Sequence, residues 1–122
     1  MQILIFGASI TYGSFDTKGG WVNRLRADID KKQDKKNTNI FNLGVPGDNT
    51  TDLKQRFIPE MEARLDPTDE TLLIFQIGLN DSQINTQKRK TRINIATFTN
   101  NILYFYDEAS KVTNKILFIC LT

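Results

Sequence analysis

Four short apolar runs alternate with segments of helical periodicity along this chain, and this pattern constrains the fold more than any other feature. The runs span residues 3–6, 40–43, 71–77 and 115–121, and none of them alternates polar with apolar side chains. Strands of that kind are covered on both faces, which predicts a parallel sheet between layers of helices. The chain has 122 residues, the size of one domain. We therefore predict an α/β fold with one domain over residues 1–122.

Three segments between the runs place apolar side chains every three or four residues, as an amphipathic helix does. The first extends from about residue 20 to 33, the second begins with a cap at Thr50, Thr51 or Asp52 and closes near Pro67, and the third covers about 96–111. Their apolar positions are Trp21, Val22, Leu25 and Ile29; Leu53, Phe57, Met61 and Leu65; and Phe98, Ile102, Phe105, Tyr106 and Ala109. Pro59 predicts a kink or a restart in the second helix. Residues 83–92 have little periodicity, which predicts a mobile loop over the strand ends.

Each of the first three apolar runs is followed at once by a glycine and a short turn. Ser9, Gly44 and Asn80 stand in these turns. Right-handed crossovers place the carboxyl ends of all parallel strands at one edge of the sheet. In a strand order 2-1-3-4, the first and third strands flank the point where open α/β sheets bind ligands. We therefore expect the three residues to converge there.

These three residues have the chemistry that acyl transfer requires, namely a nucleophile and hydrogen-bond donors for the oxyanion that develops. The hydroxyl of Ser9 would attack a carbonyl, and its own N–H, the N–H of Gly44 and the side-chain amide of Asn80 would donate. Each residue also has a plain structural interpretation. Ser9 can cap a helix, Gly44 can simply end a strand, and Asn80 can belong to a turn or a helix cap.

Three blocks of this sequence also resemble a known family, the SGNH hydrolases, or GDSL-type esterases and lipases. The blocks are FGASITYG (6–13), NLGVPGDNT (42–50) and GLND (78–81), with Trp21 and the helix around Leu53 in the usual places. The resemblance implies a flavodoxin-like three-layer α/β/α sandwich. It also implies a serine esterase that acts on a small-molecule ester, either as a lipase-like enzyme or as a carbohydrate deacetylase, without a cofactor or metal. It also implies that Ser9 is the nucleophile and that Gly44 and Asn80 are oxyanion donors.

The sequence departs from the family pattern in two places. Ala8 precedes the serine where most members have Asp, which we expect to be tolerated. The family's general base is the histidine of a C-terminal D-x-x-H block, and this sequence contains no histidine. We therefore interpret the chain as the N-terminal part of such an enzyme, truncated at the C-terminus and nearly inactive alone. Missing C-terminal elements would also leave a sheet edge uncovered, which predicts self-association.

Composition excludes several other classes of protein. The net charge of +2 does not indicate nucleic-acid binding, and the clusters at Lys31–Lys36 and Lys88–Arg92 are interpreted as solvated helix surface. The single cysteine, Cys120, is expected in the core. No run is long enough for a membrane span, and no signal sequence is apparent, which predicts a cytoplasmic protein.

Two other functions remain open from the sequence. A catalytically dead α/β module could bind a small ligand in the same crevice. A flavodoxin-like or receiver-like domain is disfavoured, because the first strand is followed by neither a glycine-rich phosphate loop nor an acidic cluster for a metal ion.

Overall fold

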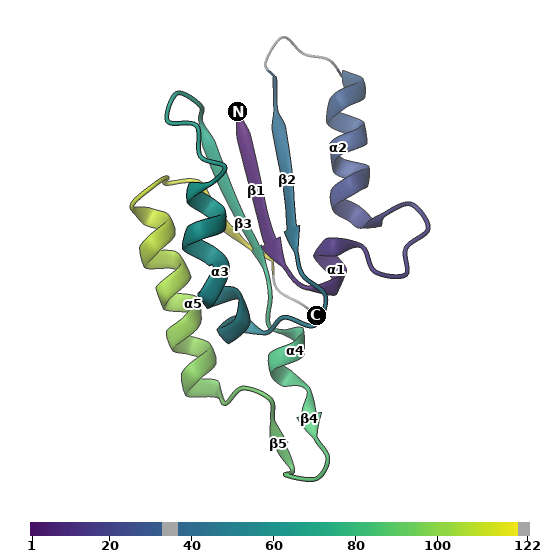
Figure 1. The fold of residues 1–122 in the computed structure, drawn as a ribbon, viewed down its shortest axis with the longest axis vertical. Helices are drawn as coiled ribbons and strands as arrows, with labels where there is room; N and C mark the ends of the chain where they lie inside the picture. The colour runs from purple at the N-terminus through teal and green to yellow at the C-terminus, as the bar shows by residue number, and fades with distance from the viewer. Residues whose placement is uncertain (33–36, 120–122) are drawn as a thin grey trace.

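A four-stranded parallel sheet runs through the computed structural model, which describes residues 1–32 and 37–119 (Figure 1). The strands are β1 (Gln2–Gly7), β2 (Asn39–Gly44), β3 (Thr71–Gln76) and β6 (Ile116–Phe118), and the helices are α1 (Ser9–Tyr12), α2 (Gly20–Lys32), α3 (Thr50–Glu62), α4 (Leu79–Ser82) and α5 (Ile95–Ser110). A two-stranded antiparallel hairpin consists of β4 (Ile84–Asn85) and β5 (Lys90–Thr91).

The order of the sheet is β2-β1-β3-β6, which matches the order 2-1-3-4 considered from the sequence, with β6 as the fourth strand. Gly7 pairs with Gly44 on one side and with Gln76 on the other, so the carboxyl ends of the three strands lie level. The turns that follow these strands therefore start from the same edge of the sheet.

Helices cover both faces of the sheet, as the apolar strands predicted. In Figure 1, α2 lies on one side of the sheet, and α3 and α5 lie on the other. Successive side chains of β1 enter different cores: Ile3 and Ile5 pack with Val22 of α2, whereas Leu4 and Phe6 pack with residues of α3 and α5. The fold is a three-layer α/β/α sandwich.

An aromatic cluster fills the centre of the α3–α5 side. Phe6, Phe57, Phe75 and Phe105 are each less than 2% exposed, and the contacting rings have centroids 5.0 to 5.6 Å apart. Each such aromatic pair adds about 0.5–1.5 kcal/mol to the stabilisation from burial. This core holds the middle of β1 and β3 rigidly beneath the turns at their carboxyl ends.

The start of α3 differs from the prediction by one residue. Asn49 is the N-cap: its side chain accepts hydrogen bonds from the N–H groups of Thr51 and Asp52, and Asp52 in turn accepts from the N–H of Asn49. This reciprocal capping box satisfies more donors than a cap at Thr50 would. Of the kink or restart predicted at Pro59, the restart was wrong, because α3 continues through it to Glu62. Pro59 lies on the exposed side of the helix, where water can solvate the carbonyl that loses its partner.

Other predictions changed in detail. The segment 83–92 forms the β4–β5 hairpin rather than an irregular loop, so its basic residues do not lie on a helix. Tyr106 is 53% exposed and does not belong to the buried face of α5. The predicted core position of Cys120 lies outside the described residues.

Candidate active site

Ser9 is the first residue of α1, a single helical turn that begins immediately after β1 and Ala8. The sequence predicted a plain turn here. Within residues 1–32 and 37–119, neither the hydroxyl nor the N–H of Ser9 forms a hydrogen bond. Both groups are therefore available to a ligand, and Ser9 does not cap the helix that it begins.

Polar side chains from the two neighbouring strands hold α1 in place. The amide oxygen of Gln76, at the end of β3, accepts hydrogen bonds from Thr11 Oγ1 and from Trp21 Nε1, both at 2.8 Å. From β2, Asn42 Nδ2 donates to the carbonyl of Thr11 at 2.9 Å. Thr11 is fully buried, so α1 is anchored from both sides and the position of Ser9 is set by the sheet.

Asn80 lies on α4, which follows β3, and its side chain is 7% exposed. Its Nδ2 donates to the carbonyl of Asp48 at 2.7 Å, and its Oδ1 accepts from Gln83 Nε2 at 3.0 Å. A primary amide has two N–H groups, so one remains available to a ligand. These contacts fix the plane of the amide.

The next residue, Asp81, fastens α4 to the start of α3. Both of its carboxylate oxygens accept from the N–H of Thr50 at 3.1 Å, and Oδ1 also accepts from Thr50 Oγ1 at 2.5 Å. Thr50 Oγ1 further accepts from Asn101 Nδ2 at 3.0 Å. Asp81 is 3% exposed, and the N-terminus of α3 favours its negative charge. The sequence suggested that Asn80-Asp81 could cap a helix. In the structure, Asp81 accepts from the first N–H of α3, a helix that follows another strand.

Gly44, a predicted oxyanion donor, lies where α1 packs on the end of β2. Its N–H donates to Asn42 Oδ1 at 3.1 Å, so the group is already engaged. A Cβ on Gly44 would lie 2.8 Å from the carbonyl oxygen of Ala8 and closer still to the N–H of Tyr12. A glycine is needed at this position because α1 packs directly on the end of β2. This engagement counts against Gly44 as an oxyanion donor.

Gly47, which lies in the block NLGVPGDNT and was given no role from the sequence, is the glycine with an open environment. It has φ of +90°, a conformation that favours glycine, and no atom lies within 4 Å of where its Cβ would be. Among the described residues its N–H has no hydrogen-bond partner. The next carbonyl, that of Asp48, is the one that accepts from Asn80. The only signal in the sequence was the Pro-Gly pair, which predicts a turn but not its position beside Asn80.

Arg56 of α3 joins this loop to the strand ends. Its guanidinium donates to Asp48 Oδ2 at 2.7 Å, to the carbonyl of Leu43 at 3.0 Å and to the carbonyl of Gly7 at 3.1 Å. The Arg56 side chain is only 18% exposed, so these charge-assisted bonds are partly shielded from water. Nothing in the sequence pattern distinguished Arg56 from the other surface cations of the chain.

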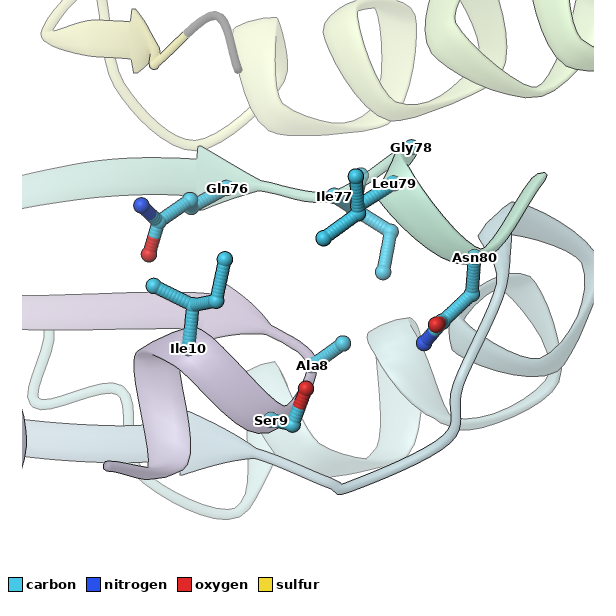
Figure 2. Close-up of a pocket in the computed structure, with 8 residues that line it drawn as sticks. All are labelled: Ala8, Ser9, Ile10, Gln76, Ile77, Gly78, Leu79 and Asn80. Carbon is cyan, nitrogen blue, oxygen red and sulfur yellow. The ribbon is translucent and has the colours of Figure 1, made fainter. Parts of the chain in front are cut away.

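Ser9 and Asn80 line one small pocket between α1 and α4, which confirms that the turns after β1 and β3 converge. The other lining residues are Ala8, Ile10, Gln76, Ile77, Gly78 and Leu79. Figure 2 shows the hydroxyl of Ser9 and the amide of Asn80 on opposite sides of the gap, with the loop after β2 running past Ser9 toward Asn80. The pocket holds about 10 Å³, roughly one water molecule. Gly44 is not among its lining residues.

Comparisons with known proteins show the family of this chain. Residues 5–120 match the GDSL-like Lipase/Acylhydrolase family. The chain belongs to that family. It is 32% identical over 127 residues to the "Uncharacterized lipoprotein YqeF" of Bacillus subtilis (strain 168), covering 98% of this chain and 48% of that protein. This member of the family therefore spans about half the length of that relative.

Solved structures of SGNH hydrolases have the same fold. The crystal structure of the lipase/acylhydrolase from Enterococcus faecalis superposes with a TM-score of 0.73 at 25% identity, over 96% of this chain and 55% of that one. AlinE4, an SGNH-hydrolase family esterase, gives a TM-score of 0.73 at 24% identity, over 96% and 57% of the two chains. The family assignment and the three-layer fold predicted from the sequence are thus confirmed.

Two further properties of the described residues bear on the chemistry. No group of three or more His, Cys, Asp or Glu side chains there could hold a metal ion. Across residues 1–32 and 37–119, no helix has the length and apolar character to cross a bilayer.

Proposed function

We propose that this GDSL-like family member acts on carboxylic esters with Ser9 as the nucleophile. The Ser9 oxygen would attack the ester carbonyl, the alcohol would leave, and water would then release the acid from the acyl-serine. The observation that carries this proposal is the Ser9 hydroxyl, which has no hydrogen-bond partner among the described residues and shares a pocket with the fixed amide of Asn80.

The oxyanion would be stabilised by donors that the structure leaves available. These are the N–H of Ser9, the second N–H of the Asn80 amide and the N–H of Gly47, which replaces Gly44 in our proposal. Preorganised donors of this kind are worth about 10²–10³-fold each in turnover. Gly44 would support the site indirectly, by letting α1 pack closely on β2.

The proton of the Ser9 hydroxyl needs an acceptor, and the 122 residues include no histidine. Loss of the base from a serine triad costs about 10⁶-fold in the subtilisin case. We therefore expect acylation by this chain alone to be slow and to depend on a base from solution. Imidazole, the side-chain group of histidine, is small enough to be tried as that base.

The test is hydrolysis of p-nitrophenyl acetate by the 122-residue chain with and without added imidazole. Imidazole should raise the rate of the wild-type chain above that of Ser9→Ala under the same conditions. Asn80→Ala should lower this Ser9-dependent rate by about 10²–10³-fold, because it removes one oxyanion donor. Intact-mass spectrometry would show acetylation, and peptide mapping would place it.

Ser14→Ala is the matched control, because Ser14 lies only five residues further along the same segment. It should behave as wild type. Equal rates for the wild-type chain and Ser9→Ala in imidazole would refute Ser9 as the nucleophile, and would favour the alternative of a ligand-binding module.

We propose small acyl esters as the substrates of the whole protein, with sugar acetates and lysophospholipids as candidates. One structural relative is described as the acetyl xylan esterase AlAXEase, with a TM-score of 0.78 at 19% identity.

We also keep the predicted cytoplasmic location as a proposal. The Bacillus subtilis relative is named a lipoprotein, so cell fractionation would be the direct test.

A further inference from the structure

The hairpin formed by residues 83–92, which we call the basic hairpin, has an unusually one-sided charge. It carries Lys88, Arg89, Lys90 and Arg92, and no Asp or Glu occurs anywhere between Asp81 and Asp107. Every residue from 82 to 92 is exposed. The overall charge of +2 conceals this local concentration of four positive charges.

These four cations also differ from most of the other cations that the structure describes, which lie beside carboxylates. Within the part of the chain that the structure describes, none of the four is in an ion pair. Carboxylates lie within ion-pair distance of seven other cations, namely Arg24, Arg26, Lys32, Arg56, Arg64, Lys111 and Lys115. No carboxylate of the described residues therefore neutralises the charge of the basic hairpin, although Arg92 donates hydrogen bonds to Gln83 and to the carbonyl of Gly47.

Exposed apolar side chains accompany the charge. Ile84, at the start of the hairpin, is 69% exposed, and Ile95, at the start of α5, is 76% exposed. Single-stranded nucleic acids bind basic surfaces that carry several aromatic side chains for base stacking. Residues 82–97 include no aromatic residue, and the next one, Phe98, is half-buried in a pocket with Thr91 and Ile95. Cations beside exposed aliphatic groups are instead typical of a surface that contacts lipid headgroups and the outer acyl region.

The basic hairpin is connected to the candidate active site. It projects beyond the carboxyl-end edge of the sheet, beneath α4 in the view of Figure 1. Gln83 Nε2 donates to Asn80 Oδ1 at 3.0 Å, and Arg92 Nη2 donates to the carbonyl of Gly47 at 3.3 Å. A surface that bound the hairpin would therefore lie at the same edge of the molecule as Ser9.

We propose that the basic hairpin binds anionic lipid surfaces. The cations contact the negative headgroups, and Ile84 and Ile95 enter the boundary between the headgroups and the acyl chains. Each Lys or Arg held near an anionic membrane strengthens binding about fivefold, so three of them account for roughly 100-fold. This binding does not require the chemistry of Ser9, and it goes beyond the ester hydrolysis proposed above.

The experiment compares two triple variants of the 122-residue chain by cosedimentation with vesicles. Lys88→Gln, Arg89→Gln and Lys90→Gln together remove three charges from the hairpin and leave Arg92, which contacts the Gly47 loop. The matched control, Lys18→Gln, Arg26→Gln and Lys31→Gln, removes three exposed charges elsewhere, so both variants have the same net charge. The vesicles are phosphatidylcholine alone, or phosphatidylcholine in which roughly one lipid in three is the anionic phosphatidylglycerol.

The wild-type chain should bind the phosphatidylglycerol vesicles and not the phosphatidylcholine vesicles, and salt should weaken this binding. The hairpin variant should bind about 100-fold more weakly, while the control variant and Ser9→Ala bind as wild type. Equal losses in the two triple variants, or binding that ignores the lipid charge, would overturn the proposal. Competition provides a second test, in which a single-stranded oligonucleotide, soluble glycerol phosphate or additional vesicles are added to the bound protein. The proposal would also be overturned if the oligonucleotide displaced the protein at a lower concentration than either of the other two competitors.

Discussion

Removal of the Asp81 carboxylate should strongly destabilise the fold, because this side chain joins α4 to the start of α3 beside the candidate active site. Asp81 accepts from the N–H and the hydroxyl of Thr50, at the first residue of α3, and is 3% exposed. In Asp81→Ala, both Thr50 donors would lose their acceptor in a buried place. The contact between α4 and α3 would be lost with them.

The magnitude follows from the contacts. A hydrogen bond to a charged group contributes about 1.5–3 kcal/mol, and a buried donor left without a partner costs about 1–3 kcal/mol. Part of this is recovered because a buried carboxylate no longer has to be desolvated. We expect the free energy of unfolding to fall by about 3 kcal/mol, out of the 5–15 kcal/mol typical of a domain. For a domain of this size that corresponds to a fall in Tm of about 10–15 °C.

Urea unfolding followed by circular dichroism measures this effect directly. Asp81→Asn should lose about half as much, because its amide oxygen can still accept one bond from Thr50. Asp107→Ala is the matched control: it removes the same charge from an exposed position on α5, and should change stability by less than about 0.5 kcal/mol. A loss in Asp81→Ala no larger than in Asp107→Ala would refute the role assigned to the carboxylate.

Two further predictions concern the segments around α1. Gly44→Ala should lower the free energy of unfolding by about 2–3 kcal/mol in the same urea assay, because the new methyl group would clash with the backbone at Tyr12. A variant as stable as wild type would contradict the close packing of α1 on β2. Hydrogen bonds from the Arg24 side chain and from the N–H of Lys18 hold the pKa of Asp16 below its usual 3.8. The folded state therefore gains stability from the ionised carboxylate above that pH and loses it as the pH falls through the lowered pKa, so the Tm of Asp16→Asn should fall less steeply on acidification than that of wild type.

The residue pattern was enough to predict the parallel sheet and the helical layers that cover it. Strands whose apolar residues do not alternate with polar ones must be covered by helices on both faces of the sheet, and short helical crossovers are right-handed. Few topologies were therefore compatible with the chain. The same reasoning placed Ser9 and Asn80 at one edge. It could not distinguish Gly44 from Gly47, because the two glycines differ only in which atoms come near them across β1 and α1.

The sequence alone therefore determined that the strands are parallel and covered on both faces, and which turns carry the candidate chemistry, since both follow from local patterns of apolar and polar residues. Tertiary structure decided the rest. The Arg56 contacts to three segments, the Asp81–Thr50 junction and the unpaired charge of the basic hairpin all depend on distances between residues far apart in the chain. A side chain's hydrogen-bonding capacity can be read from its type, but its partners exist only once the chain has folded.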